Sequence, residues 1–155
     1  MKSSPRQHTR RHVMTMGAAV ALAAWLKPNM VLADEAAVAA EIKKLYGDKQ
    51  AEASKVVKLD IPEIAENGLV VPINVEVMSP MTDADYVKAV HVFADGNPLP
   101  GVITYRFTPA CGKAAASTRM RLAQTQNVVC IAELSNGSLH MAKVNVKVTI
   151  GGCGG

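Results

Sequence analysis

The residue best suited to covalent chemistry is Cys153, which lies among the last five residues of the chain, Gly151-Gly152-Cys153-Gly154-Gly155. Four glycines around one cysteine cannot pack into a core, and holding them in one conformation costs much backbone entropy. We therefore expect residues 151–155 to form a flexible arm. Five extended residues reach roughly 17 Å, which is enough to carry a thiol into the cleft of another protein.

No neighbour in the sequence activates the thiol of Cys153. No basic residue is adjacent to it, and the terminal carboxylate disfavours a second negative charge. An unactivated thiol suits a carrier, whose cargo is attached and removed inside enzymes that supply the activation, and it suits a catalytic nucleophile poorly. The alternative is an idle tail that forms adventitious disulfides, but an exposed idle thiol is a liability in an oxidising compartment.

A targeting segment occupies residues 1–33. Arg10-Arg11 precede an apolar run from Gly17 to Leu26, and Val31-Leu32-Ala33 supplies small or apolar residues at the expected cleavage point. This pattern is typical of a twin-arginine (Tat) export signal. The alternative, a membrane anchor, is disfavoured because a run of about ten residues is too short to cross a bilayer, which needs roughly 20. The sequence predicts an exported, periplasmic protein.

The charge of the chain changes when this segment is removed. The full sequence has a formal net charge of +4, but five of its 17 basic residues lie in residues 1–33, whereas all 13 acidic residues follow them. The mature chain therefore has a charge near −1, which gives no support for nucleic-acid binding. We also expect no membrane partner and no metal or catalytic site.

Two kinds of element must position the arm. Asp34 can cap a helix on which Val38, Ile42 and Leu45 follow at helical spacing, and Gly47 is a plausible end. Beyond it, apolar residues alternate with a period of two in segments 69–77, 86–93, 102–107, 117–122, 129–131 and 144–150. Asn136-Gly137 predicts a hairpin turn before the last of these strands.

These elements predict an all-β protein, an antiparallel β-sandwich with a short N-terminal helix and a flexible C-terminal arm. The expected organisation is a signal peptide over residues 1–33, a helical segment over 34–54, a sandwich over 55–150 and the arm over 151–155.

The sequence also resembles the SoxY family, the sulfur-binding subunits of the bacterial Sox sulfur-oxidising system. The resemblance extends over essentially the whole chain. It is carried by the tail Gly151-Gly152-Cys153-Gly154-Gly155, Ile61-Pro62-Glu63-Ile64-Ala65-Glu66-Asn67-Gly68, Pro80-Met81, Val92-Phe93-Ala94, Asn97-Pro98-Leu99-Pro100 and Thr118-Arg119-Met120-Arg121-Leu122-Ala123.

The resemblance implies an immunoglobulin-like sandwich that forms a heterodimer with a second sandwich subunit, SoxZ. It implies that a haem c cytochrome couples thiosulfate to Cys153 as a thiosulfonate, that a manganese hydrolase releases sulfate, and that a sulfur dehydrogenase oxidises the remaining persulfide. The chain would then be a carrier without cofactors and without catalytic activity of its own.

Cys111 and Cys130 depart from what the resemblance leads us to expect, since the tail cysteine is the constant feature of the family. In an oxidising compartment we expect a disulfide between them, which would close a loop of about 20 residues and stabilise the fold by roughly 3 kcal/mol. The alternative is two separate buried thiols that act as small apolar residues.

Two other functions remain open from the sequence. Gly154-Gly155 invites comparison with ubiquitin-like carriers that hold sulfur as a terminal thiocarboxylate, although such carriers need adenylation in the cytoplasm, which the export signal disfavours. Alternatively, Cys153 forms a permanent disulfide to a partner, and the chain is a structural subunit.

Overall fold

We describe a computed structural model of the chain, which covers residues 32–151. The expected export signal lies outside these residues except at its last two positions, and most of the arm lies outside them as well. Among the residues described, no helix is long and apolar enough to span a membrane.

Helix α2 (Glu35–Tyr46) begins and ends where the sequence predicts. The Oδ1 atom of Asp34 accepts a hydrogen bond of 2.8 Å from the amide of Ala37, which satisfies one of the free amides of the first turn. At the other end Gly47 adopts a positive φ of 66°, and its amide donates to the carbonyl of Lys43 at 2.7 Å.

Up to residue 151, nine strands follow the helix, with one short 3₁₀ helix, η1 (Pro109–Cys111), between the sixth and the seventh. Their bounds are β1 (Glu52–Ala53), β2 (Val57–Asp60), β3 (Ile64–Asn67), β4 (Val71–Val77), β5 (Val87–Ala94), β6 (Gly101–Arg106), β7 (Ala114–Met120), β8 (Gln126–Leu134) and β9 (Leu139–Ile150).

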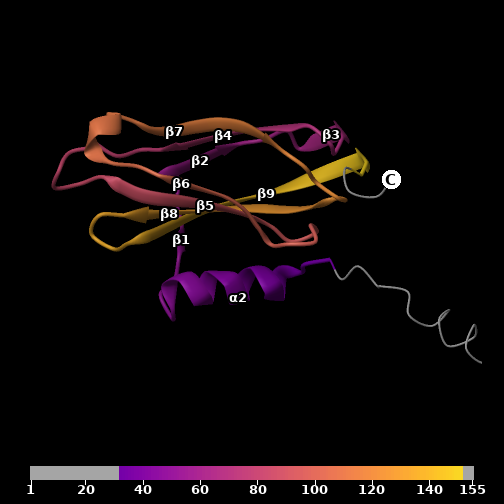
Figure 1. Ribbon diagram of the computed structural model, residues 1–155, viewed down its shortest axis with the longest axis horizontal. Helices are drawn as coiled ribbons and strands as arrows, with labels where there is room; N and C mark the ends of the chain where they lie inside the picture. The colour runs from indigo at the N-terminus through magenta and orange to yellow at the C-terminus, as the bar shows by residue number, and fades with distance from the viewer. Residues whose placement is uncertain (1–31, 152–155) are drawn as a thin grey trace, which may run out of the picture. The chain divides into compact units, whose positions relative to one another are not determined.

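The strands form two sheets that face each other, with α2 on the outer side of the larger one (Figure 1). The larger sheet has the order β1-β9-β8-β5-β6, with β3 also paired to β9, and the smaller has the order β2-β4-β7. Strands β8 and β9 form a hairpin in which Gln126 is paired with Val146 and Glu133 with Leu139. Gly137 takes a φ of 83° in its turn, as Asn136-Gly137 predicts.

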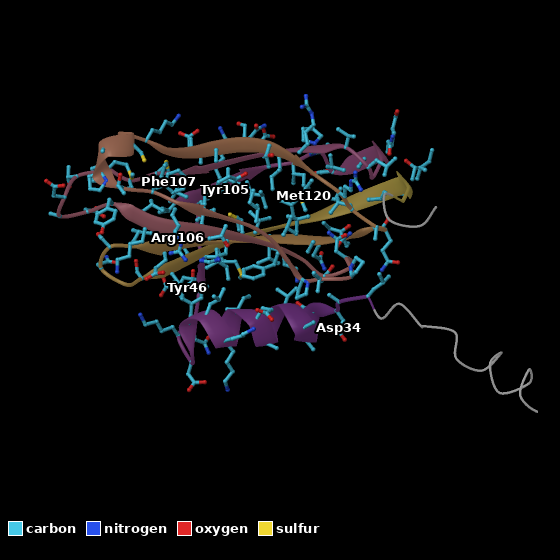
Figure 2. All side chains as sticks on the ribbon, in the orientation of Figure 1. Asp34, Tyr46, Tyr105, Arg106, Phe107 and Met120 are labelled. Atoms are coloured by element: carbon cyan, nitrogen blue, oxygen red, sulfur yellow. The ribbon has the colours of Figure 1, made fainter. Side chains whose placement is uncertain are left out.

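Apolar residues fill both faces of the larger sheet. Between the sheets lies the main core, which includes Ile73, Val90, Val128 and Val146. Tyr105 and Phe107 point towards this core at the β6 edge, whereas Arg106 points to the side of α2 (Figure 2). On that side a second cluster joins Val38 of α2 to residues of the sheet, namely Phe93, Val129, Ile131 and Leu139.

The expected two-sheet β architecture with a short N-terminal helix is confirmed, but the sheets are not purely antiparallel. Strands β1 and β3 each pair with β9 in parallel, with Glu52 opposite His140 and Ala65 opposite Val148. Both strands are short and show no strict alternation of apolar residues, which is why the sequence did not indicate them. The second of these parallel pairs borders the start of the arm.

Candidate functional site

The thiol predicted to do the chemistry, Cys153, lies outside the described residues, as do Gly152, Gly154 and Gly155. Gly151, the first residue of the predicted arm, is described. The site can therefore be built up to the point where the chain leaves strand β9, and we call Ile150, Gly151 and their backbone neighbours Gly68, Leu122 and Ala123 the arm root.

Strand β3 holds one side of β9 up to its last residue. The amide of Lys147 donates to the carbonyl of Glu63 at 2.8 Å, and the hydroxyl of Thr149 donates to the carbonyl of Ala65 at 3.2 Å. The amide of Gly68, just beyond β3, donates to the carbonyl of Ile150 at 2.7 Å. The ladder therefore continues to the residue that precedes the arm.

The loop between β7 and β8 holds the other side. The amide of Val148 donates to the hydroxyl oxygen of Thr125 at 3.0 Å, in place of a strand partner. The amide of Leu122 donates to the carbonyl of Gly68 at 2.8 Å, so this loop is also tied to the turn after β3. The turn after β3 and the loop between β7 and β8 are thus hydrogen-bonded to each other as well as to β9.

Gly151 passes so close to this loop that only glycine fits. A Cβ atom built on Gly151 would collide with the carbonyl oxygen of Ala123. A backbone oxygen cannot swing aside as the end of a long side chain can, so a larger residue would have to displace the strand end or the loop. The sequence suggested glycine here for flexibility, and the structure adds a steric reason.

Exposed apolar side chains surround the hydrogen bond between Gly68 and Ile150. Leu69 and Val70 follow Gly68 and have exposed fractions of 46% and 55%, while Ile150 is 67% exposed. Large apolar side chains cluster on protein surfaces chiefly where another surface binds. The sequence placed Leu69 and Ile150 at the apolar positions of alternating strands and did not single out Val70, so it did not indicate this exposed apolar cluster.

The disulfide predicted between Cys111 and Cys130 is not formed, and that prediction was wrong. Both cysteines are free thiols. Cys130 lies in the middle of β8, opposite Val92 and Ala142, and is fully buried in the core between the sheets. Cys111 lies in η1, outside the strands and exposed to solvent. The expectation of two buried thiols therefore holds only for Cys130.

The two thiols differ in acidity for different reasons. Burial raises the pKa of Cys130 to about 12, so this thiol stays protonated. Hydrogen bonding to the backbone of Thr108, and secondarily to its hydroxyl, lowers the pKa of Cys111. The Thr108 oxygen lies 3.8 Å from the Cys111 sulfur. Among the described residues, Cys111 is thus the exposed thiol and Cys130 the buried one.

Cys111 is nevertheless far from the arm root along the sandwich. Strand β7 runs between the two, with its first residue, Ala114, close to η1 and its last, Met120, close to Leu122. Seven residues of strand span roughly 20 Å. In Figure 1, η1 and the end of β9 lie at opposite ends of the sheets.

Side chains that bind metal ions do not gather among residues 32–151. These residues hold no group of three or more His, Cys, Asp or Glu side chains that could bind a metal ion. His91 lies in β5 and His140 in β9, and each contacts a hydroxyl, that of Thr104 for His91 and that of Ser138 for His140. The hydrogen bonds at the arm root hold the end of β9 in place, so the arrangement can present a chain end.

The comparisons with known proteins agree with this geometry. Residues 42–153 match the family model described as sulfur oxidation protein SoxY, and the match thus includes Cys153. Among solved structures, the chain is similar to the sulfur carrier protein SoxY from Chlorobium limicola f thiosulfatophilum, with 31% identity and a TM-score of 0.63 over 74% of this chain and 98% of that one. No curated protein matches the chain.

More distant structures share the fold alone. Superoxide reductase (neelaredoxin) from Ignicoccus hospitalis is 16% identical with a TM-score of 0.54, over 77% of this chain and 95% of that one. A putative superoxide reductase from Thermotoga maritima is 19% identical with a TM-score of 0.51, over 69% and 89% of the two chains.

Proposed function

The chain belongs to the SoxY family of sulfur carriers in sulfur oxidation, and we propose that it carries thiosulfate-derived sulfur covalently on Cys153 in the periplasm. The observation that carries this proposal is the arm root. Strand β9 is held on both sides up to Ile150, and the chain then leaves through a glycine that admits no side chain. A rigid base followed by side-chain-free residues suits a thiol that must enter another protein.

The proposed loading step is an oxidation. The thiolate of Cys153 and the outer sulfur of thiosulfate form a sulfur–sulfur bond, giving Cys–S–S–SO₃⁻ and two electrons, which a haem c cytochrome accepts. A manganese-dependent hydrolase then adds water, releasing sulfate and two protons and leaving the persulfide Cys–S–S⁻. A sulfur dehydrogenase oxidises the remaining sulfur. The carrier itself supplies only the attachment point in each step.

The partners of this proposal are proteins. A SoxZ-like subunit completes a heterodimer of sandwiches, which we take to be immunoglobulin-like, and the three enzymes act on the arm in turn. The exposed apolar side chains of Leu69, Val70 and Ile150 support protein contacts beside the arm root, because they offer apolar area that a partner would bury. The Arg10-Arg11 signal supports export by the Tat route.

Cys111 competes poorly with Cys153 as the attachment point. It lies in a 3₁₀ helix in which its amide donates to the carbonyl of Thr108 at 2.9 Å, so its backbone is fixed, whereas Cys153 follows two glycines. The pKa of Cys111 is lowered, which favours its reaction with small reagents at the surface but does not extend its reach.

The experiment compares three variants of the exported protein in thiosulfate oxidation with the host's Sox enzymes. Cys153→Ser should abolish sulfate formation, Cys111→Ser should preserve it, and deletion of Gly154-Gly155 should only impair it. Complete loss on deletion of the two glycines, with Cys153 unmodified in the wild type, would favour a terminal thiocarboxylate instead. Full activity of Cys153→Ser would refute the carrier function.

A further inference from the structure

Two buried amide side chains, Asn97 and Gln126, lie behind the arm root. Their exposed fractions are 9% and 4%, although amide side chains are usually exposed. Asn97 belongs to the loop between β5 and β6, and Gln126 is the first residue of β8. The Nε2 atom of Gln126 donates to the Oδ1 atom of Asn97 at 3.0 Å, which joins the β5–β6 loop to the start of β8.

Asn97 holds the loop between β7 and β8, which Gly151 contacts as the chain leaves β9. Its Oδ1 atom accepts a hydrogen bond of 3.0 Å from the amide of Ala123, and its Nδ2 atom donates to the carbonyl of Arg121 at 2.9 Å. The two bonds bracket Leu122, which is fully buried and donates its own amide to Gly68. Asn97 therefore fixes the backbone on both sides of Leu122, up to the amide of Ala123, the residue whose carbonyl limits Gly151.

Gln126 in turn holds Asn97. Its Oε1 atom accepts from the amide of Gly96 at 2.7 Å, and its Nε2 atom also donates to the carbonyl of Gln124 at 3.1 Å. Gly96 has to be glycine for this approach, since a Cβ there would lie 2.9 Å from the Cβ of Gln126. The oxygen and the nitrogen of both amides thus each have at least one hydrogen-bond partner, as buried polar groups require.

We propose that Asn97 and Gln126 are positioning residues that set where and in which direction the carrier arm leaves the sandwich. They act through Ala123 and Leu122 on Gly151 and Ile150 and do not touch the cargo. An apolar pair would fill the same space without satisfying the backbone groups of both loops, so the amides specify the placement of the arm root. This inference rests on the proposed carrier function only for its purpose, the delivery of cargo, because the hydrogen bonds that position the arm root do not depend on that function.

The first test measures the arm root itself, by amide hydrogen exchange on the full exported chain. Gln126→Met keeps the side-chain length and removes every hydrogen bond of the amide. We expect exchange at the amides of Gly68 and Leu122 to rise by roughly tenfold, as for the loss of one buried hydrogen bond. The amide of Val92, in the middle of β5, should be unchanged.

Two further variants keep the test decisive. Gln126→Glu retains the acceptor for Gly96 but loses both donors, and should show the same loosening if Gln126→Met fails to fold. Asn145→Ala removes an exposed amide on β9 that donates only to Asn127, at 3.0 Å, and should leave the arm root unchanged. Wild-type exchange at Gly68 and Leu122 in both Gln126 variants would overturn the proposal.

The second test measures delivery of the arm, in the SoxZ-paired carrier with thiosulfate and the haem c cytochrome. Gln126→Met should raise the KM for the carrier several-fold with kcat unchanged, while alkylation of Cys153 by iodoacetamide keeps its wild-type rate. A loosened arm root with an unchanged KM would overturn the positioning role. If the wild type forms no sulfur adduct, the carrier function fails, and the exchange rates still decide whether the amides hold the arm root.

Discussion

The amide of Gly68 donates a hydrogen bond of 2.7 Å to the carbonyl of Ile150, which joins the turn after β3 to the last residue of β9. This bond extends the parallel pair of β3 and β9 to the last residue of β9. The arm consequently starts from a fixed point and not from a frayed strand end. Substitution of the next residue, Gly151, tests directly whether the end of β9 is fixed.

Replacing Gly151 by alanine should disturb this fixed point, because the added Cβ would collide with the carbonyl oxygen of Ala123. We expect the bond between Gly68 and Ile150 to weaken and the free energy of unfolding to fall by about 0.5–1.5 kcal/mol. Urea unfolding measures the loss, and hydrogen exchange at Gly68 locates it.

Gly101→Ala is the matched control for this substitution. Gly101 is an exposed glycine at the start of β6, and no atom lies within 4 Å of a Cβ built on it. Its replacement should leave the unfolding free energy within about 0.5 kcal/mol of the wild type. Equal losses of unfolding free energy in the two variants would show that the close approach of Gly151 to the Ala123 carbonyl does not require glycine.

Cys111 and Cys130 should differ strongly in their rates of alkylation in the folded protein. Cys111 should be alkylated readily, and its rate should reach half-maximum at a lower pH than in the unfolded chain, because hydrogen bonding to Thr108 lowers its pKa. Cys130 should react only after unfolding, since it is fully buried. Peptide mass spectrometry of samples alkylated at a series of pH values measures both, and a Cys111–Cys130 disulfide in the oxidised protein would contradict the structure.

His91 should make the stability fall as the pH is lowered. Burial, and then the charge of Arg106, lower the pKa of His91 below its ordinary value, while Glu133 acts in the opposite sense. The His91 ring contacts Tyr46, the last residue of α2, at a centroid distance of 5.7 Å, and Phe93 at 6.2 Å. Tyr46 lies between α2 and the larger sheet (Figure 2). The folded state therefore favours the neutral ring.

The sign of this effect follows from proton linkage. The unfolded chain binds the proton first as the pH falls below about 6.5, so the contribution of His91 to stability is complete above that pH and is lost towards the folded pKa. Urea unfolding between pH 8 and pH 5 should show a steeper loss in the wild type than in His91→Gln. Identical slopes would mean that protonation of His91 does not disfavour the fold.

The sequence predicted those parts of the fold that local patterns determine. The alternation from Val144 to Ile150 and the turn at Asn136-Gly137 predicted the β8–β9 hairpin, and Asp34 predicted the start of α2. The parallel pairing of β3 with β9 joins residues more than 80 positions apart, as Ala65 and Val148 are. No local pattern indicates such a pair.

The errors and omissions at the site have physical causes too. Cys111 and Cys130 are separated by a suitable number of residues, but sequence separation does not show that one side chain faces the core and the other the solvent. The apolar run from Val128 to Ile131 was the available indication that β8 is covered on both faces. Asn97 and Gln126 were missed because nothing in a sequence separates a buried amide from the common exposed one.

The central claim is that Cys153 carries the sulfur, and intact and peptide mass spectrometry test it most directly. The protein is purified from cells fed thiosulfate and analysed without reductant, beside the variants Cys153→Ser and Cys111→Ser. We predict reducible thiosulfonate and persulfide adducts on Cys153 in the wild type and in Cys111→Ser, and none in Cys153→Ser. A Cys153 that stays unmodified throughout turnover, or adducts that persist in Cys153→Ser, would contradict it.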